Sequence, residues 1–223
     1  MSLVSVRDAS VRLGVSVRQV QRYAAAGQIT AVGPARVDLE SVLRLEATRS
    51  AHRRRAWQGH TAWAAIASLS AVEATWLGQP QVSRLRTSLR SMTAEELVAR
   101  TRNRAHVHLL QGHRAAVDRI AAEIVTTGSG EAVGDLATQT RATADGYVTS
   151  DVFDDLVSRY NLTEGTGTTS NVTLRVTSFD PETIRQIAAA GEVLAGLDLA
   201  DSLDTRERAA GLQVLTAALG ADR

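Results

Sequence analysis

A glycine turn near the N-terminus separates two short amphipathic stretches and limits how this part of the chain can fold. Residues 6–12 favour a helix, and Gly14 breaks its pattern. Ser16 suits the N-cap of a second helix, because its hydroxyl can accept a hydrogen bond from an early backbone amide. That helix is expected over residues 17–26, with Gly27 as its stop. Two short helices joined by a glycine-containing turn predict a helix-turn-helix layout.

The residues after this pair of helices predict a small β wing. Residues 28–32 suit a strand, Gly33-Pro34 marks a turn, and residues 36–38 can return as a second strand. A further helix is expected over residues 39–47. The alternative interpretation of the whole segment is a plain amphipathic helical hairpin.

The second helix of the turn carries side chains that can read DNA. Arginine can bond bidentately to guanine and glutamine to adenine, and both lie near the N-terminal end of the helix, where a recognition helix meets base edges. Arg18, Gln19 and Arg22 are the expected principal contacts, with Gln21 secondary. The full set of expected DNA-binding residues is Ser16, Val17, Arg18, Gln19, Gln21, Arg22, Arg36, Arg53, Arg54 and Arg55. The last three belong to a basic run that either tracks the phosphate backbone or is a solvated linker.

The formal net charge of +1 conceals an uneven distribution of charge. Residues 1–119 hold 18 arginines against eight acidic residues, a balance of +10, and residues 120–223 hold seven against 16, a balance of −9. A basic front half is expected of a nucleic-acid-binding protein. The acidic back half either binds a basic protein or is simply a solvated surface.

The first 50 residues resemble the excisionase- and MerR-type winged helix-turn-helix. The matching residues are Leu13-Gly14-Val15-Ser16-Val17-Arg18, Val20-Gln21-Arg22-Tyr23 and Gly27-Gln28-Ile29. The resemblance implies a DNA-binding domain over residues 1–50, with double-stranded operator DNA as its partner.

Residues 56–223 predict a second, larger domain. Alanine and leucine are abundant, only three prolines occur, and 4% of residues are aromatic, so the core should be aliphatic and the fold rich in helix. The expected fold class is mainly α with minor β (α+β): a winged helix-turn-helix followed by a helix-rich α/β domain. Helices are expected over residues 56–77, 82–92, 94–102 and 117–124, after Ser150, from Pro181, and from Asp204 to Leu219, and strands over residues 105–109 and 172–176.

Several classes of protein are excluded or disfavoured by what the sequence lacks. It contains no cysteine, which excludes disulfides and cysteine-ligated zinc and fits a cytoplasmic location. No apolar run approaches the ~18 residues that a membrane span needs, so no membrane partner is expected. His106 and His108 share one strand face without a nearby carboxylate or cysteine, and we interpret them as structural or surface histidines without a metal.

Two groups of acidic residues raise the question of catalysis: Asp151, Asp154 and Asp155 at one helix start, and Asp198, Asp201 and Asp204 at every third position. Paired carboxylates can perform acid–base or metal chemistry. However, acids at helix N-termini also stabilise the helix dipole, and acidic faces are usually solvated. No glycine-rich phosphate loop or nucleophile–histidine signature accompanies them. The sequence therefore predicts no enzyme, no catalytic residue, no metal and no cofactor.

The larger domain resembles the antitoxin half of AbiEi-type toxin–antitoxin pairs. The matching residues are Ser83-Arg84-Leu85-Arg86, Asn171-Val172-Thr173-Leu174-Arg175-Val176, Leu197-Asp198-Leu199-Ala200-Asp201-Ser202-Leu203-Asp204 and Arg206-Glu207-Arg208-Ala209-Ala210-Gly211-Leu212. The resemblance implies a repressor of its own operon that neutralises a nucleotidyltransferase-like toxin. Two alternatives remain: a one-component regulator whose larger domain senses a small ligand, and an enzyme fused to a DNA-binding module. A homodimer is expected, because one small winged module buries little DNA.

Overall fold

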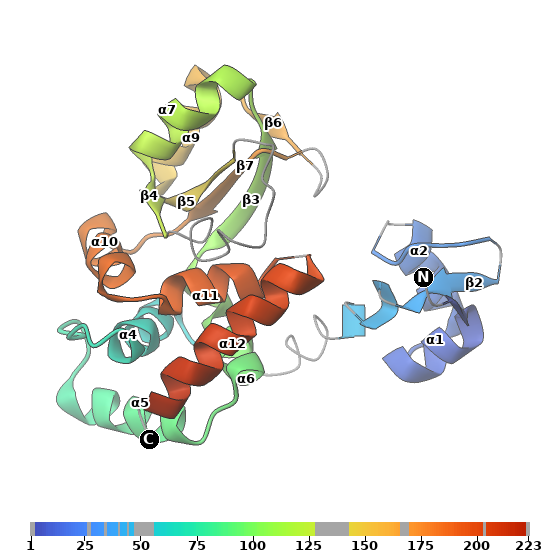
Figure 1. Ribbon diagram of the computed structural model, residues 1–223, viewed down its shortest axis with the longest axis horizontal. Coiled ribbons are helices and arrows are strands. Elements are labelled where there is room, and N and C mark those ends of the chain that lie inside the picture. The colour runs from blue at the N-terminus through green and yellow to red at the C-terminus, as the bar shows by residue number, and fades with distance from the viewer. Residues whose placement is uncertain are drawn as a thin grey trace. The chain divides into compact units, whose positions relative to one another are not determined.

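The computed structural model divides into two compact units, Met1–Arg55 and Ala56–Arg223 (Figure 1). The structure describes residues 3–25, 28–33, 35–39, 41–43, 45–46, 56–127, 143–165, 170–202 and 204–221. In these ranges the protein is mostly helical with a smaller β component, which confirms the predicted mainly α, minor β class. None of the helices in the described ranges combines the length and apolarity needed to cross a membrane.

The N-terminal unit packs two helices against a small antiparallel β element. Strand β1 (Leu3–Ser5) pairs with β2 (Arg36–Asp38). Helix α1 (Val6–Leu13) ends at Gly14, whose φ of 61° lies in the left-handed region that glycine adopts without a Cβ penalty. Helix α2 (Val17–Ala25) follows directly.

An aliphatic core holds this unit together. Its buried members come from α1, α2, β2 and the segments after α2 and β2: Ala9, Leu13, Val20, Ile29, Val37 and Val42. The described residues between 39 and 46 are helical, where the sequence predicted a helix over 39–47.

The strand predicted over residues 28–32 is reduced to one β-bridge, between Ala31 and Val37. The amide of Val32 donates to the Arg36 carbonyl at 2.8 Å, so the backbone still runs as a short ladder. Residues 28 and 29 do not join it, because both of their amides donate to the carbonyl of Tyr23 and so close the end of α2. Strand β1 was not predicted.

The larger unit contains a five-stranded mixed sheet in the order β4-β5-β7-β3-β6. The strands are β3 (His106–Gln111), β4 (Val125–Thr126), β5 (Ala144–Val148), β6 (Thr163–Glu164) and β7 (Val172–Val176). Strands β5 and β7 run parallel, and the other neighbouring pairs are antiparallel. Only β3 and β7 were predicted from the sequence.

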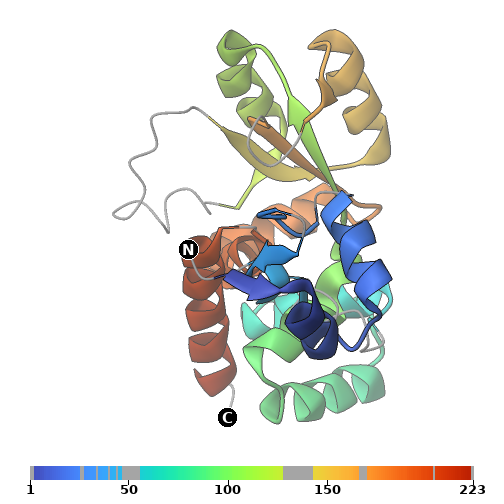
Figure 2. The same ribbon diagram turned by 90° about the vertical axis from the view of Figure 1, so that its right-hand side faces the viewer.

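Helices α7 (Val117–Glu123) and α9 (Ser150–Arg159) pack on one face of this sheet (Figure 2). Their buried contacts include Ile120, Leu156 and Leu174. The ring of His108 lies 4.5 Å from that of Phe153, centroid to centroid, so this histidine packs against α9.

A second core is built from the remaining helices of the larger unit: α4 (Gly59–Leu69), α5 (Gln79–Arg90), α6 (Ala94–Thr101), α10 (Pro181–Ala190), α11 (Val193–Ala200) and α12 (Thr205–Ala221). Trp63, Leu97, Leu194 and Leu215 are among its buried side chains. Short 3₁₀ turns at Arg102–Arg104 and Arg114–Ala116 precede β3 and α7.

The helix predicted over residues 56–77 was wrong in its second half, since α4 ends at Leu69. Ala71 adopts a left-handed φ of 56°, and the chain turns there. The turn brings Trp76 back against α4 and Phe179. Its indole N–H donates to the His60 carbonyl at 3.0 Å, and its ring centroid lies 4.8 Å from that of Phe179. Packing this indole on the core replaces the helical continuation that the apolar spacing predicted.

Candidate nucleic-acid interface

Two local interactions fix how α2 is oriented in its unit. The hydroxyl of Ser16 accepts a hydrogen bond from the Gln19 amide at 3.2 Å, as expected of an N-cap. Val20 is fully buried in the core of the unit. With the start capped and Val20 turned inward, the opposite side of α2 faces solvent.

The solvent-facing side of α2 gathers the polar residues that the sequence singled out. Its exposed positions are Val17, Arg18, Gln21, Arg22 and Ala25, and these fall within about 140° of the helix circumference at 3.6 residues per turn. The half-buried Gln19 lies at the flank of this face. On this face Gln21 lies on the Val17 side of the two arginines, about 60° from Arg18, whereas Gln19 lies outside the face.

The charge of the two arginines on this face is not compensated by the described residues. Neither Arg18 nor Arg22 forms an ion pair there, and α2 has no acid in its first turn. The acids described in this unit are engaged elsewhere: Asp8 accepts from the Ser5 hydroxyl, Asp38 from the Ser41 amide, and Glu46 pairs with Arg12 at 2.7 Å. The outward face of α2 is a positive surface on which the amide side chain of Gln21 lies beside the two arginines.

The remaining predicted contacts are placed differently. Arg36 is exposed at the start of β2, opposite Ser5 of β1, and its side chain forms no hydrogen bond or ion pair with the described residues of α2. Arg53, Arg54 and Arg55 lie outside the described residues.

A second candidate site is a buried polar network in the larger unit. The guanidinium of Arg104 donates to Tyr147 Oη at 2.8 Å, to Asp198 Oδ1 at 2.9 Å and to Asp201 Oδ2 at 2.7 Å. Tyr147 also donates to Asp198 Oδ1 at 2.7 Å, and the Thr127 hydroxyl donates to its other oxygen at 2.9 Å. The side chains of Arg104 and Asp198 are 3% and 0% exposed.

The network continues onto the neighbouring strand through Arg175. Its guanidinium forms a two-pronged pair with Asp145, at 3.0 and 2.9 Å, and its Nε lies 3.3 Å from Asp198 Oδ1. Burial works against the charge of Arg104, yet Tyr147, Asp201 and Asp198 hold its pKa well above the ordinary value. Burial raises the pKa of Asp145 to about 6, although Arg175 acts to lower it.

The network explains why acidic residues recur at every third position of the C-terminal segment. Asp198 and Asp201 anchor α11 to β5, to β7 and to Arg104, while Asp204 accepts hydrogen bonds from the Arg206 and Glu207 amides at the start of α12. These carboxylates are bound to arginine, hydroxyl or amide donors, as buried and capping carboxylates usually are.

The acidic group at the start of α9 also has local roles. A hydrogen bond with the Thr149 side chain lowers the pKa of Asp151, and Asp155 pairs with Arg159 one turn along the helix. Within the described ranges, no cluster of three or more histidine and acidic side chains is arranged to hold a metal ion.

No family model, curated protein or solved structure matches this chain. In the N-terminal unit, the outward face of α2 presents two exposed arginines that form no ion pair with another described residue.

Proposed function

We propose that the N-terminal unit is a winged helix-turn-helix that binds duplex DNA, and that the protein is a sequence-specific transcriptional repressor. The observation that carries this proposal is the outward face of α2, where Arg18, Gln21 and Arg22 are exposed on a capped helix. Nine residues of helix extend about 14 Å, and a helix of this diameter fits the major groove of B-DNA, which is about 12 Å wide.

Each side chain on this face has a chemical role in the proposal. Arg18 and Arg22 donate bidentately to guanine, and Gln21, which lies beside them on the same face, pairs with adenine. Val17, which is 41% exposed at the start of α2, contacts a thymine methyl group. Arg36 serves as a phosphate contact from the β element.

A gel-shift titration on DNA from the upstream region of the gene tests this assignment. Arg18→Ala, Gln21→Ala and Arg22→Ala should each weaken specific binding by about 1–3 kcal/mol and relax the preference at one base pair. Gln19→Ala is the matched control, because it changes the same helix at its half-buried flank and should cost less. Unchanged binding in the three variants, or a greater loss with Gln19→Ala, would reject this face as the reader.

We further propose that the repressor is the antitoxin of an AbiEi-type pair and neutralises a nucleotidyltransferase-like toxin. Support comes from the resemblance of the larger domain and from its acidic surplus. Exposed carboxylates at Asp154, Glu164 and Glu192 form no ion pair with another described residue. A toxin that handles RNA would present a basic surface, and opposite charges favour the encounter of such partners.

The two activities can be separated in the full-length protein. The double variant Arg18→Ala/Arg22→Ala should lose repression of a reporter while still protecting cells that express the neighbouring gene product. Asp154→Asn combined with Glu192→Gln should show the reverse, with reduced protection and intact repression. Absence of any protection by the wild-type protein would remove the antitoxin assignment, and a metabolite bound to the purified protein would favour a ligand-sensing regulator.

A further inference from the structure

Helix α5 of the larger unit is strongly basic. Its 12 residues include Arg84, Arg86 and Arg90 and no acidic residue. All three arginines are exposed, while Leu85 and Leu89 bury the opposite side against the helical core. The positive charge therefore belongs to the surface of this helix and not to its packing.

Some exposed arginines elsewhere in the unit do have carboxylate partners. Arg159 of α9 pairs with Asp155 and with Glu123, the latter at 2.9 Å, and Arg185 of α10 pairs with Glu182 at 2.8 Å. The arginines of α5 form no ion pair with another described residue. Arg86 and Arg90 lie one turn apart, where two like charges repel each other. An anionic ligand between them would relieve that repulsion.

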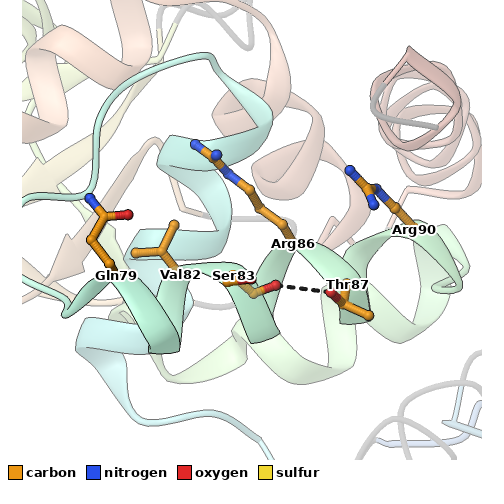
Figure 3. Close-up of a pocket in the computed structure, with 6 residues that line it drawn as sticks. All are labelled: Gln79, Val82, Ser83, Arg86, Thr87 and Arg90. Atoms are coloured by element: carbon orange, nitrogen blue, oxygen red, sulfur yellow. Dashed lines mark hydrogen bonds between the residues drawn. The ribbon is translucent and has the colours of Figure 1, made fainter.

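The two arginines border a groove (Figure 3). A hollow of about 230 Å³ is lined by Gln79, Val82, Ser83, Arg86, Thr87 and Arg90. The five polar members of this set fall within about 100° of the helix. Figure 3 shows the two guanidinium groups extending from the same side of α5, with Thr87 Oγ1 donating to the Ser83 carbonyl at 3.0 Å.

A neighbouring hollow of about 730 Å³ shares four residues with the first, Gln79, Val82, Arg86 and Arg90. Its other wall is the turn between α4 and α5, which contributes Glu73 as its acidic residue. Counting the two arginines and Glu73, the lining keeps a net positive charge. The hydrogen-bonding groups of the groove thus belong mainly to one helix and extend along it for about 16 Å, from Gln79 to Arg90.

We propose that this groove of α5 binds the phosphodiester backbone of nucleic acid, as a second contact that carries no sequence preference. Guanidinium groups pair with phosphate oxygens bidentately, and hydroxyl and amide side chains are the usual further donors to them. Protein interfaces are instead centred on buried aromatic and apolar anchors, whereas the stripe on α5 offers only Val82 and the apolar side chains of the neighbouring hollow, such as Val72 and Leu77, are aliphatic. The proposal stands apart from base reading by α2, since it concerns the other unit.

The test uses the full-length protein and a duplex of random sequence, with the dissociation constant measured by fluorescence anisotropy from low to moderate salt. Arg86→Gln/Arg90→Gln should weaken binding about tenfold or more at low salt and reduce the slope of log K against log salt by about 1.8, the value for two lost phosphate contacts. Arg86→Lys/Arg90→Lys should keep most of the slope, because it keeps the charge. Melting temperatures of the variants should match the wild type, since both positions are exposed.

Arg185→Gln is the matched control, an exposed arginine on α10 that is paired with Glu182. It should leave the affinity and the slope unchanged. An unchanged slope in the α5 double variant would overturn the proposal. So would binding of polyglutamate that is as tight as binding of the duplex and is lost in the α5 double variant, because it would indicate an acidic protein as the occupant. Loss of sequence preference in Arg18→Ala with an intact α5 effect would separate the two contacts. If the wild type shows no sequence preference while the α5 variants still lose affinity, the proposed repressor function is rejected and the proposed phosphate-binding groove of α5 is supported.

Discussion

Asp145 is subject to two opposing effects at one site. Burial and the neighbouring Asp198 raise its pKa, whereas the two-pronged contact with Arg175 lowers it, and the result is a pKa of about 6. Because the folded value lies above the ordinary value of 3.8, the folded protein holds this proton more tightly than the unfolded chain does. The stabilisation from that proton is complete below about pH 4 and is lost as the pH rises through about 6.

Asp145→Asn should remove this pH dependence, because the amide has no carboxyl proton to lose and its oxygen can still accept from Arg175. Melting temperatures of both proteins should be measured between pH 4 and pH 7.5. The wild type should lose stability relative to the variant as the pH rises across this window. A difference between the two that stays constant with pH would contradict the raised pKa of Asp145.

Asp198 is the central acceptor of the same network, with Arg104, Tyr147 and Thr127 all donating to it. Asp198→Ala should reduce the free energy of unfolding by about 3–5 kcal/mol, because it leaves the buried Arg104 without this partner. Urea denaturation followed by circular dichroism measures the change. Asp154→Ala is a suitable control, since this exposed acid of α9 should shift the transition by less than about 0.5 kcal/mol. Equal shifts in the two variants would show that the network contributes little.

At the scale of elements, α11 and α12 approach each other at a glycine. A Cβ placed on Gly211 of α12 would lie 2.5 Å from both the Ala200 amide nitrogen and the Gly196 carbonyl oxygen of α11. Gly211→Ala should therefore force the helices apart and destabilise the protein by about 1–3 kcal/mol. Gly220→Ala in the same helix is the control, because a Cβ there meets nothing within 4 Å.

The control should gain as much as about 1 kcal/mol from the higher helix propensity of alanine. Both values come from thermal or urea unfolding. A stabilising Gly211→Ala would mean that α11 and α12 are not in such close contact.

Local signals in the sequence predicted local structure well. The helices expected over residues 94–102 and from Pro181 are both present, and they begin at a capping box of Thr93 with Glu96 and at an Asp180 N-cap, whose partners lie three positions apart. The strand β5 was missed, because its sequence Ala-Asp-Gly-Tyr-Val contains Asp145 and Gly146, which are rare in strands. Asp145 becomes favourable through Arg175, a partner distant in sequence, and a Cβ on Gly146 would lie 2.7 Å from the Val125 carbonyl oxygen of β4.

The same limit applies to the candidate site. The residues of α2 could be selected from the sequence, because arginine and glutamine follow a glycine turn and a serine cap. The order of Gln19 and Gln21 could not, because it depends on the rotation of α2 about its axis. Burial of Val20 fixes that rotation and turns Gln21 outward.

For the whole molecule, one copy of α2 carries too few base-reading side chains for tight operator binding. Three side chains at about 1–3 kcal/mol each supply about 3–9 kcal/mol, and contacts at the low end of that range fall short of the about 4–10 kcal/mol that separates specific from non-specific sites. Two copies on a palindromic site overcome this shortfall, so we expect a homodimer on half-sites about 34 Å apart, one helical turn of DNA.

Analytical ultracentrifugation should give two chains per duplex, and hydroxyl-radical footprinting should show two protected half-sites with that spacing. Moving the half-sites apart by five base pairs places them on opposite faces of the DNA and should abolish tight binding. Tight binding of a single chain to one short, non-repeated site would contradict the dimer and would require further contacts, such as those proposed for α5, to supply the missing affinity.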